Sequence, residues 1–367
     1  METRAIAGPV LAFVFVSFIG ISAAAQDMQQ QLVLANQHET PVITIKSPGA
    51  AGNKLGFEGG CVIKLKGTYH LFTSEMVDKP LGVKMKLGHW TSTDRAHWKR
   101  ISTLYESSGD YTGKDPRAAL WAPMPVYNDR EGRWNLFYVA YRCAPSTAEK
   151  WLEGHEGEIW RAASKVKGPD GIGGPYEDIG IILQPGPDSQ PWEGLQGTDS
   201  IFPYQAGDRW YGFYGSADTQ EIPTKAWKVG LASAPDLAGP WKRLPEGNPI
   251  MIEKVFIENP VVTKLNDGTF AAVYDCPVPN AVGYTFSGDG IHWESGRSLI
   301  VQPSGKGHWA HDVRTPLGLI PEGGDTFTLF YTGLYHAPAS APGSGDVADY
   351  AVGFATVKLT HPGVRKP

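Results

Sequence analysis

The chain has 367 residues and a formal net charge of -5, and 19% of its residues are charged. This balance argues against a nucleic-acid-binding protein, which needs a basic stripe on its surface. Twelve Trp, fifteen Tyr and fourteen Phe accompany 44 Gly and 29 Pro, a composition that indicates many short strands joined by tight turns.

The first 25 residues have the features of a secretory signal peptide. Arg4 lies near the start, residues 10–21 are apolar, and residues 22–25 are small and contain an Ala-x-Ala pattern. This pattern predicts cleavage after Ala25. We therefore expect a secreted or periplasmic protein, with no membrane partner after cleavage, since no later segment is long and apolar enough to cross a membrane.

The three cysteines, Cys61, Cys143 and Cys276, are an odd set. Their spacing is typical of neither a disulfide framework nor a metal site. We expect buried thiols within strands, although one disulfide bridge remains open.

After the predicted signal peptide, residues 26–56 are expected to form an entry segment with one strand at 40–45. Residues 57–367 are expected to form a single catalytic domain. Its fourth unit illustrates the pattern: Glu258 precedes an apolar run, residues 266–268 (Asn-Asp-Gly) form a turn, and residues 269–274 are a second, aromatic and β-branched strand.

The same order of strand, tight turn, aromatic strand and further strands occurs five times. The units start near Phe57, Leu120, Thr198, Ile257 and His311, roughly 50 to 80 residues apart, which fits propeller blades with loop insertions. The sequence therefore predicts an all-β fold, a five-bladed β-propeller. A β-sandwich is the structural alternative, which the recurrence of this order in every unit disfavours.

The first strand of each propeller blade lines the central channel, so the residues at the heads of these strands should converge. They are Glu58, Trp121, Asp199, Glu258 and, in the fifth unit, His311 and Arg314. Carboxyl groups at such positions are costly to desolvate unless they are paired or used, and several in one funnel push their pKa values apart. Hydrolysis of an acetal needs this separation, with one carboxyl protonated as acid and one ionised as base or nucleophile.

Residues 57–360 resemble glycoside hydrolase family 43 and related five-bladed β-propeller glycosidases. The most specific matches are residues 197–202 (Gly-Thr-Asp-Ser-Ile-Phe) and 257–260 (Ile-Glu-Asn-Pro). The resemblance implies that Glu258 is the general acid, that Asp199 tunes and orients this acid, and that Glu58 is the general base. It also implies inversion of the anomeric configuration. Glu58 departs from the family pattern, which has Asp followed by Pro at this position.

The other expected substrate-binding residues are Trp121, Trp192, His311 and Arg314. Trp121 is suited to stacking a sugar ring, and Trp192 lies in a polar loop ahead of the third unit. Relatives place a histidine near the channel axis, sometimes at a bound metal, and either His308 or His311 is a candidate for it. No metal ligand set is predicted and no cofactor is required, although a structural metal ion in the central channel remains open.

The sequence therefore predicts an exported glycoside hydrolase that acts on plant- or algal-type polysaccharides or oligosaccharides, with arabinofuranosidase- or xylosidase-like activity. The expected partner is a carbohydrate, and no oligomeric state is predicted. Two other functions remain open. One is a carbohydrate-binding propeller without catalysis, and the other is a glycoside phosphorylase that uses Arg314 and His311 to hold phosphate.

Overall fold

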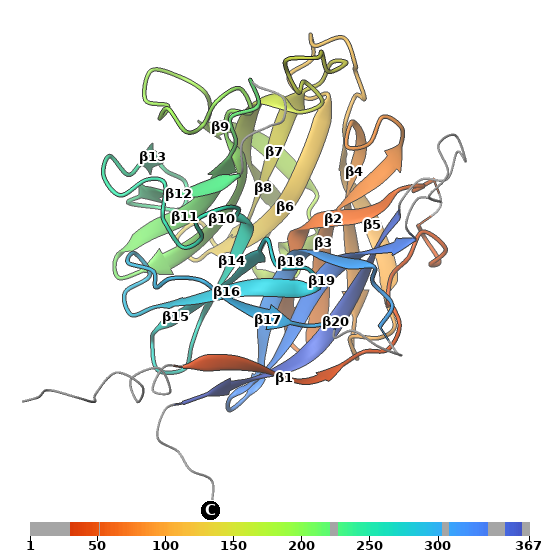
Figure 1. Cartoon of the computed structure of the whole chain (residues 1–367), viewed down its shortest axis with the longest axis vertical. Helices are drawn as coiled ribbons and strands as arrows, with labels where there is room; N and C mark the ends of the chain where they lie inside the picture. The colour runs from red at the N-terminus through yellow and green to blue at the C-terminus, as the bar shows by residue number, and fades with distance from the viewer. Residues whose placement is uncertain (1–29, 51, 221–226, 303–307, 337–348, 362–367) are drawn as a thin grey trace, which may run out of the picture.

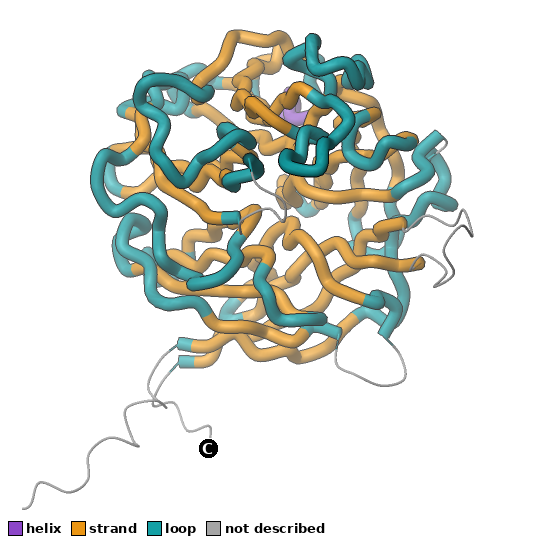
Figure 2. The backbone as a smooth tube through the Cα atoms, turned by 45° about the horizontal axis from the view of Figure 1, so that its top comes forward, coloured by secondary structure: helices purple, strands orange, loops and turns teal. Residues whose placement is uncertain are grey.

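A computed structural model describes residues 30–50, 52–220, 227–302, 308–336 and 349–361. This part of the chain consists of strands, turns and one short 3-10 helix, Pro169–Gly173 (Figure 2). Among the described residues, no helix has the length and apolar character needed to cross a membrane. The predicted signal peptide lies outside the described residues.

The strands form five blades of four strands each, which confirms the predicted five-bladed β-propeller. In the first four blades, consecutive strands of the chain are neighbours in the sheet. These blades contain β2 (Gly56–Leu65), β3 (Thr68–Asp78), β4 (Lys84–Ser92) and β5 (Lys99–Glu106); β6 (Ala119–Asn128), β7 (Arg133–Arg142), β8 (His155–Lys167) and β9 (Tyr176–Leu183); β10 (Asp199–Ala206), β11 (Arg209–Ser216), β12 (Lys228–Ala234) and β13 (Lys242–Arg243); and β14 (Glu258–Lys264), β15 (Phe270–Asp275), β16 (Ala281–Ser287) and β17 (Arg297–Ile300).

The fifth blade joins the two ends of the described chain. It contains β18 (Asp312–Gly323), β19 (Thr326–His336) and β20 (Asp349–Thr360), and its fourth strand is β1 (Gln31–Gln37). β1 is antiparallel to β20, with Gln31 opposite Thr360, and the two strands lie side by side in Figure 1. The expected entry segment therefore supplies a blade strand. The strand predicted at 40–45 does not form, and only Ile43 makes an isolated bridge, to Val352.

The first and fifth blades meet at a single parallel bridge between Gly56 and Tyr350. Gly56 has φ of 95°, and a Cβ atom there would lie 2.0 Å from the Tyr350 carbonyl oxygen. Only glycine allows this approach. The bridge places the head of β2 beside the fifth blade, next to the centre of the ring.

The apolar core lies between neighbouring blades. Each pair of adjacent blades shares a cluster of buried side chains, as expected when the faces of twisted sheets pack around an axis. Representative pairs are Leu87 and Tyr138, Phe137 and Trp241, Phe213 and Tyr274, Val273 and Leu329, and Trp90 and Phe330. Cys61, Cys143 and Cys276 are buried and free, as predicted. Only Cys61 lies within a strand, however, because Cys143 directly follows β7 and Cys276 directly follows β15.

Candidate active site

The first strands of the blades, β2, β6, β10, β14 and β18, lie around the middle of the ring (Figure 1). One cavity-lining side chain lies near the head of each: Glu58, Trp121, Asp199, Glu258 and Arg314. A β-bulge follows or flanks each position, with register shifts at 58/60, 121/124, 199/201, 258/261 and 313/316. Because a bulge redirects a side chain and ends the regular pairing, this repeated irregularity aims five side chains into one space.

The cavity has a volume of about 430 Å³. Polar groups and aromatic rings both line it, which is typical of a small-molecule site. The sequence-predicted residues Glu58, Trp121, Asp199, Glu258 and Arg314 are all among its lining residues. The structure thus brings together five of the seven candidate residues.

Arg314 contacts three carboxyl groups. Its Nη2 atom lies 2.8 Å from Glu58 Oε1 and 3.7 Å from Glu258 Oε2, and its Nη1 atom lies 3.4 Å from Asp275 Oδ2. The charge of Glu58 is the main cause that raises the pKa of Arg314 above its ordinary value. The guanidinium therefore stays charged and bridges Glu58 and Glu258 from the fifth blade.

The surroundings of Glu258 favour the protonated form of its carboxyl group. Burial raises its pKa well above the ordinary value, the nearby Arg314 charge opposes this rise, and the charges of Asp199, Asp275 and Glu58 add to it. Glu58, in contrast, accepts the short charge-assisted hydrogen bond from Arg314. The two glutamates thus lie in one cavity with unequal environments.

Asp199 is 6% exposed, and several polar groups contact its carboxyl group. Its Oδ1 atom accepts a 2.6 Å hydrogen bond from the Ser200 amide, and Tyr141 and Gln196 contact its carboxyl group. Burial raises the pKa of Asp199, while the Tyr141 hydrogen bond lowers it. The aspartate is therefore held in place by partners from β7 and from the segment that precedes β10.

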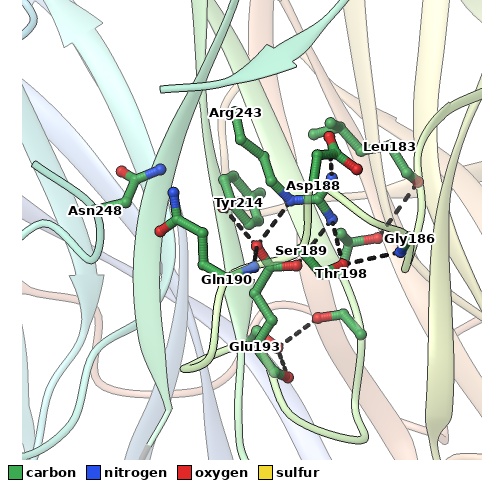
Figure 3. A network of polar contacts seen from close by, with 12 residues as sticks. Leu183, Gly186, Asp188, Ser189, Gln190, Glu193, Thr198, Tyr214, Arg243 and Asn248 are labelled. Carbon is green, nitrogen blue, oxygen red and sulfur yellow. Dashed lines mark hydrogen bonds and ion pairs between the residues drawn. The ribbon is translucent and has the colours of Figure 1, made fainter. Parts of the chain in front are cut away.

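A polar network around the buried Glu193 and Arg243 supports this segment, residues 184–198 (Figure 3). Arg243 donates to both carboxylate oxygens of Glu193, at 2.7 and 2.8 Å, and to Asp188 at 2.9 Å. The Tyr214 hydroxyl also donates to Glu193. Because bidentate arginine–carboxylate contacts fix geometry, this network anchors the residues that lead into Asp199 to the third blade.

The same segment explains why Trp192 is not at the cavity. The Trp192 indole donates to Gln190, its ring lies 5.5 Å from the Tyr214 ring, and it packs over Gly230 of β12. Trp192 therefore belongs to the apolar packing of the third blade, and the predicted platform at the cavity rim does not form there.

His311 is also outside the cavity. It is exposed, and its backbone amide donates to the Leu334 carbonyl. His308 is exposed as well, and its ring contacts the Ala310 carbonyl. Of the histidine and arginine predicted at the fifth blade, the structure places only Arg314 in the site. Among the described residues, no group of three or more His, Cys, Asp or Glu is arranged to hold a metal ion.

Sequence reasoning missed Asp275, a buried carboxyl group that does not line the cavity but contacts Arg314. Asp275 is 3% exposed and lies directly opposite Glu258 in the β14–β15 pair. Burial raises its pKa to about 7, the Arg314 charge opposes this rise, and the charges of Glu58 and Asp312 add to it. The second strand of each blade is antiparallel to the first, so its last residues lie beside the first residues of the first strand. Inspecting the ends of the second strands as well would have identified Asp275 of β15 and Tyr141 of β7.

The raised pKa of Asp275 predicts a pH-dependent stability. Because an aspartate in the unfolded chain has a pKa of about 3.9, the folded protein binds the extra proton between about pH 4 and 7, and the free energy of unfolding falls as pH rises. In Asp275→Asn this fall should be smaller, by about 3 kcal/mol between pH 5 and 8. Urea denaturation at several pH values measures it. Asp129→Asn, at an exposed turn, is the control, and an unchanged slope in Asp275→Asn would contradict the prediction.

Sequence reasoning also missed most of the cavity rim. Several additional lining residues come from loops: Trp151, Glu153, Gln196, Trp227, Phe256 and Leu81. Their convergence depends on how loops of different blades fold, and local patterns do not predict this. Phe256 is the exception, because its position two residues before Glu258 could have indicated that it lies near the site.

No protein-family model matches the sequence, and the search of curated proteins finds no match. The structure is similar to Zg3597, a family 117 glycoside hydrolase of Zobellia galactanivorans (15% identity, 91% of each chain, TM-score 0.60).

It is also similar to a GH43_1 enzyme of Xanthomonas citri complexed with xylose (14% identity, 88% of this chain and 90% of that one, TM-score 0.53). A third similar structure is the catalytic domain of a GH62 α-L-arabinofuranosidase of Coprinopsis cinerea (14% identity, 89% and 97%, TM-score 0.54). The resemblance predicted from the motifs is thus confirmed at the level of the fold. The chain has the β-propeller fold of these glycoside hydrolases.

Proposed function

We propose that this chain is a glycoside hydrolase that cleaves glycosidic bonds in plant- or algal-type polysaccharides or their oligosaccharides. One observation carries the proposal: Glu58 and Glu258 face one cavity, and burial raises the pKa of Glu258 while Glu58 pairs with Arg314. Two carboxyl groups in unequal environments are what glycoside hydrolysis requires. The similar structures with xylose and with arabinofuranosidase activity support a pentose-containing substrate.

In this mechanism Glu258 is the general acid. The bond between the anomeric carbon and the leaving oxygen breaks, its electron pair goes to that oxygen, and the oxygen takes the proton of Glu258. Asp199 and the other buried carboxyl groups help to keep this proton on Glu258, because their negative charges raise its pKa. Asp199 thus acts through Glu258.

Glu58 is the general base of the proposed reaction. It takes a proton from a water molecule, whose oxygen forms the new bond to the anomeric carbon. Arg314 lies between the two glutamates and contacts both. We propose that the reaction inverts the anomeric configuration, as the resemblance to family 43 implies, and proton NMR of the first product tests this.

The two rival functions make different demands on the site. A phosphorylase needs several cations for phosphate, but Arg314 is the only Arg, Lys or His that the described residues contribute to the cavity lining. Arg314 is also already neutralised by carboxylates. A non-catalytic binding propeller has no need for the unequal glutamate pair. Hydrolysis needs only the carboxyl groups and water, so we propose that no cofactor is required.

We also propose that the protein is exported to the periplasm or the medium, on the basis of the signal-like residues 1–25. This places it where polymeric glycans are found. Cell fractionation with an antibody to the full chain tests the export.

A substrate screen tests the function. Purified protein is incubated with aryl glycosides, with xylo- and arabino-oligosaccharides, and with plant and algal polysaccharides, each with and without phosphate. We expect release of free sugar that does not depend on phosphate. Release of a sugar phosphate would favour the phosphorylase, and binding without turnover would favour the binding propeller.

A further inference from the structure

Three aromatic side chains form one side of the cavity. Trp151, Trp227 and Phe256 all line it and are half-buried. The Trp151 and Trp227 ring centroids are 5.9 Å apart, and those of Trp227 and Phe256 are 6.3 Å apart, both in edge-to-face geometry. We call these three residues the aromatic wall. They come from the second, third and fourth blades, so the wall brings together side chains of three neighbouring blades.

The aromatic wall is fixed to the stretch that carries Glu258. The Ile257 amide donates to the Trp227 carbonyl, which ties Trp227 to the residue between Phe256 and Glu258. The Trp151 amide donates to the Thr219 carbonyl in the loop that follows β11. These backbone contacts hold the three rings in one unit on the Glu258 side.

Other residues form the side that is next to Glu58. Leu81 and Gly82 belong to the first blade, and the Trp121 indole donates to the Gly82 carbonyl. The Ala122 amide donates to Ser74 of β3, directly opposite Glu58 in the sheet. The cavity therefore has a Glu58 side and a Glu258 side, and the aromatic wall belongs to the latter.

The position of the acid determines which part of a substrate meets the wall. The acid must reach the leaving oxygen, whereas the water activated by the base attacks from the opposite face of the sugar. The leaving group therefore lies on the Glu258 side. Sugar rings present apolar C–H faces that pack well on aromatic side chains, and a small alkyl leaving group would leave most of such a surface uncovered.

We propose that Trp151, Trp227 and Phe256 bind a sugar unit of the leaving group, so that the natural substrate is an oligosaccharide or polysaccharide chain and not a simple glycoside. This inference rests on the proposed function for the assignment of the leaving-group side. The aromatic wall then selects substrates by the sugar unit on the leaving-group side of the cleaved bond.

The test compares wild type with Trp227→Ala on two kinds of probe. The first kind is xylotriose and arabinotriose, and the second is xylosyl and arabinofuranosyl fluoride, whose leaving group is a single atom. We expect kcat/KM for the trisaccharide to fall at least about tenfold in Trp227→Ala, with kcat/KM for the fluoride unchanged. Trp227→Phe, which keeps a ring, should recover most of the loss.

Two controls keep the result interpretable. Trp210→Ala removes a half-buried Trp of β11 that does not line the cavity, and it should leave both rates unchanged. Melting temperatures identify any variant that fails to fold, and in that case the Phe256→Ala variant replaces it. An equal loss on both kinds of probe, or no loss on the trisaccharide, would overturn the inference.

Binding measurements separate this inference from the proposed function. In wild type, each trisaccharide that binds should bind at least about tenfold more tightly than its monosaccharide. Trp227→Ala should lose this gain in affinity. If the gain depends on Trp227 but no sugar is released, the wall binds sugar and the hydrolase proposal fails. If wild type shows no gain for either trisaccharide, the wall is not a sugar-binding surface.

Discussion

Replacing Glu258 by Gln should lower kcat on xylo- or arabino-oligosaccharides by about 1000-fold, because the leaving sugar oxygen then receives no proton from the protein. On a dinitrophenyl glycoside or a glycosyl fluoride the loss should stay below about tenfold, since these leaving groups depart without protonation. Gln keeps the size of Glu258 and is uncharged like the protonated acid, so the melting temperature should not fall. Initial rates on both substrate classes measure the effect.

The pH profile gives a second readout for the same variant. Wild-type activity on oligosaccharides should decline as pH rises through the raised pKa of Glu258, because the acid loses its proton there. In Glu258→Gln, turnover of the fluoride should lack this decline. Glu156→Gln is a matched control, since Glu156 is an exposed glutamate that pairs with Arg142. Equal losses on both substrate classes would show that Glu258 is not the acid.

The five-bladed fold could be predicted from sequence because its signals are local. Each unit contains its own turn, as at Asn266 to Gly268, and its own aromatic strand, so the repeat can be counted without a structure. The closing strand could not be predicted in this way. β1 pairs with β20 at the far end of the chain, and no nearby pattern marks that partner. Pro41 lacks an amide donor, which helps to explain why residues 40–45 form only a bridge at Ile43.

The same distinction explains which site residues could be predicted: the repeat places the strand heads, whereas contacts between distant segments place the loops. Glu58, Asp199 and Glu258 could be placed together because equivalent strand heads in a cyclic repeat must converge. Trp192 was misplaced because its loop is folded back by the Glu193–Arg243 contact, a pairing between residues 50 positions apart. Asp275 and the aromatic wall come from strand ends and loops, where position depends on packing between blades.

The bridging position of Arg314 links the two proposed catalytic glutamates electrostatically. Arg314 lowers the pKa of Glu258, and the charge of Glu58 raises it. Any change at Glu58 therefore has two effects, one on the attacking water and one on the acid across the cavity. This coupling makes Glu58 the most informative position to alter.

Glu58→Gln should lower kcat by about 1000-fold on oligosaccharides and on glycosyl fluorides alike, because neither substrate can react without an activated water. The neutral side chain also removes a negative charge next to Arg314, which then stabilises the ionised form of Glu258 more strongly. The alkaline decline of the residual oligosaccharide activity should therefore shift to lower pH.

Glu58→Asp keeps the charge but withdraws the carboxylate by one methylene, so it should retain more activity than Glu58→Gln and show no such pH shift. Rates between pH 4 and 9 on both substrates measure these effects. Retention of the anomeric configuration in the wild-type product would make Glu58 a nucleophile instead of a base. A variant Glu58→Gln that still hydrolyses the fluoride at the wild-type rate would exclude both roles, since the attacking group would then lie elsewhere in the cavity.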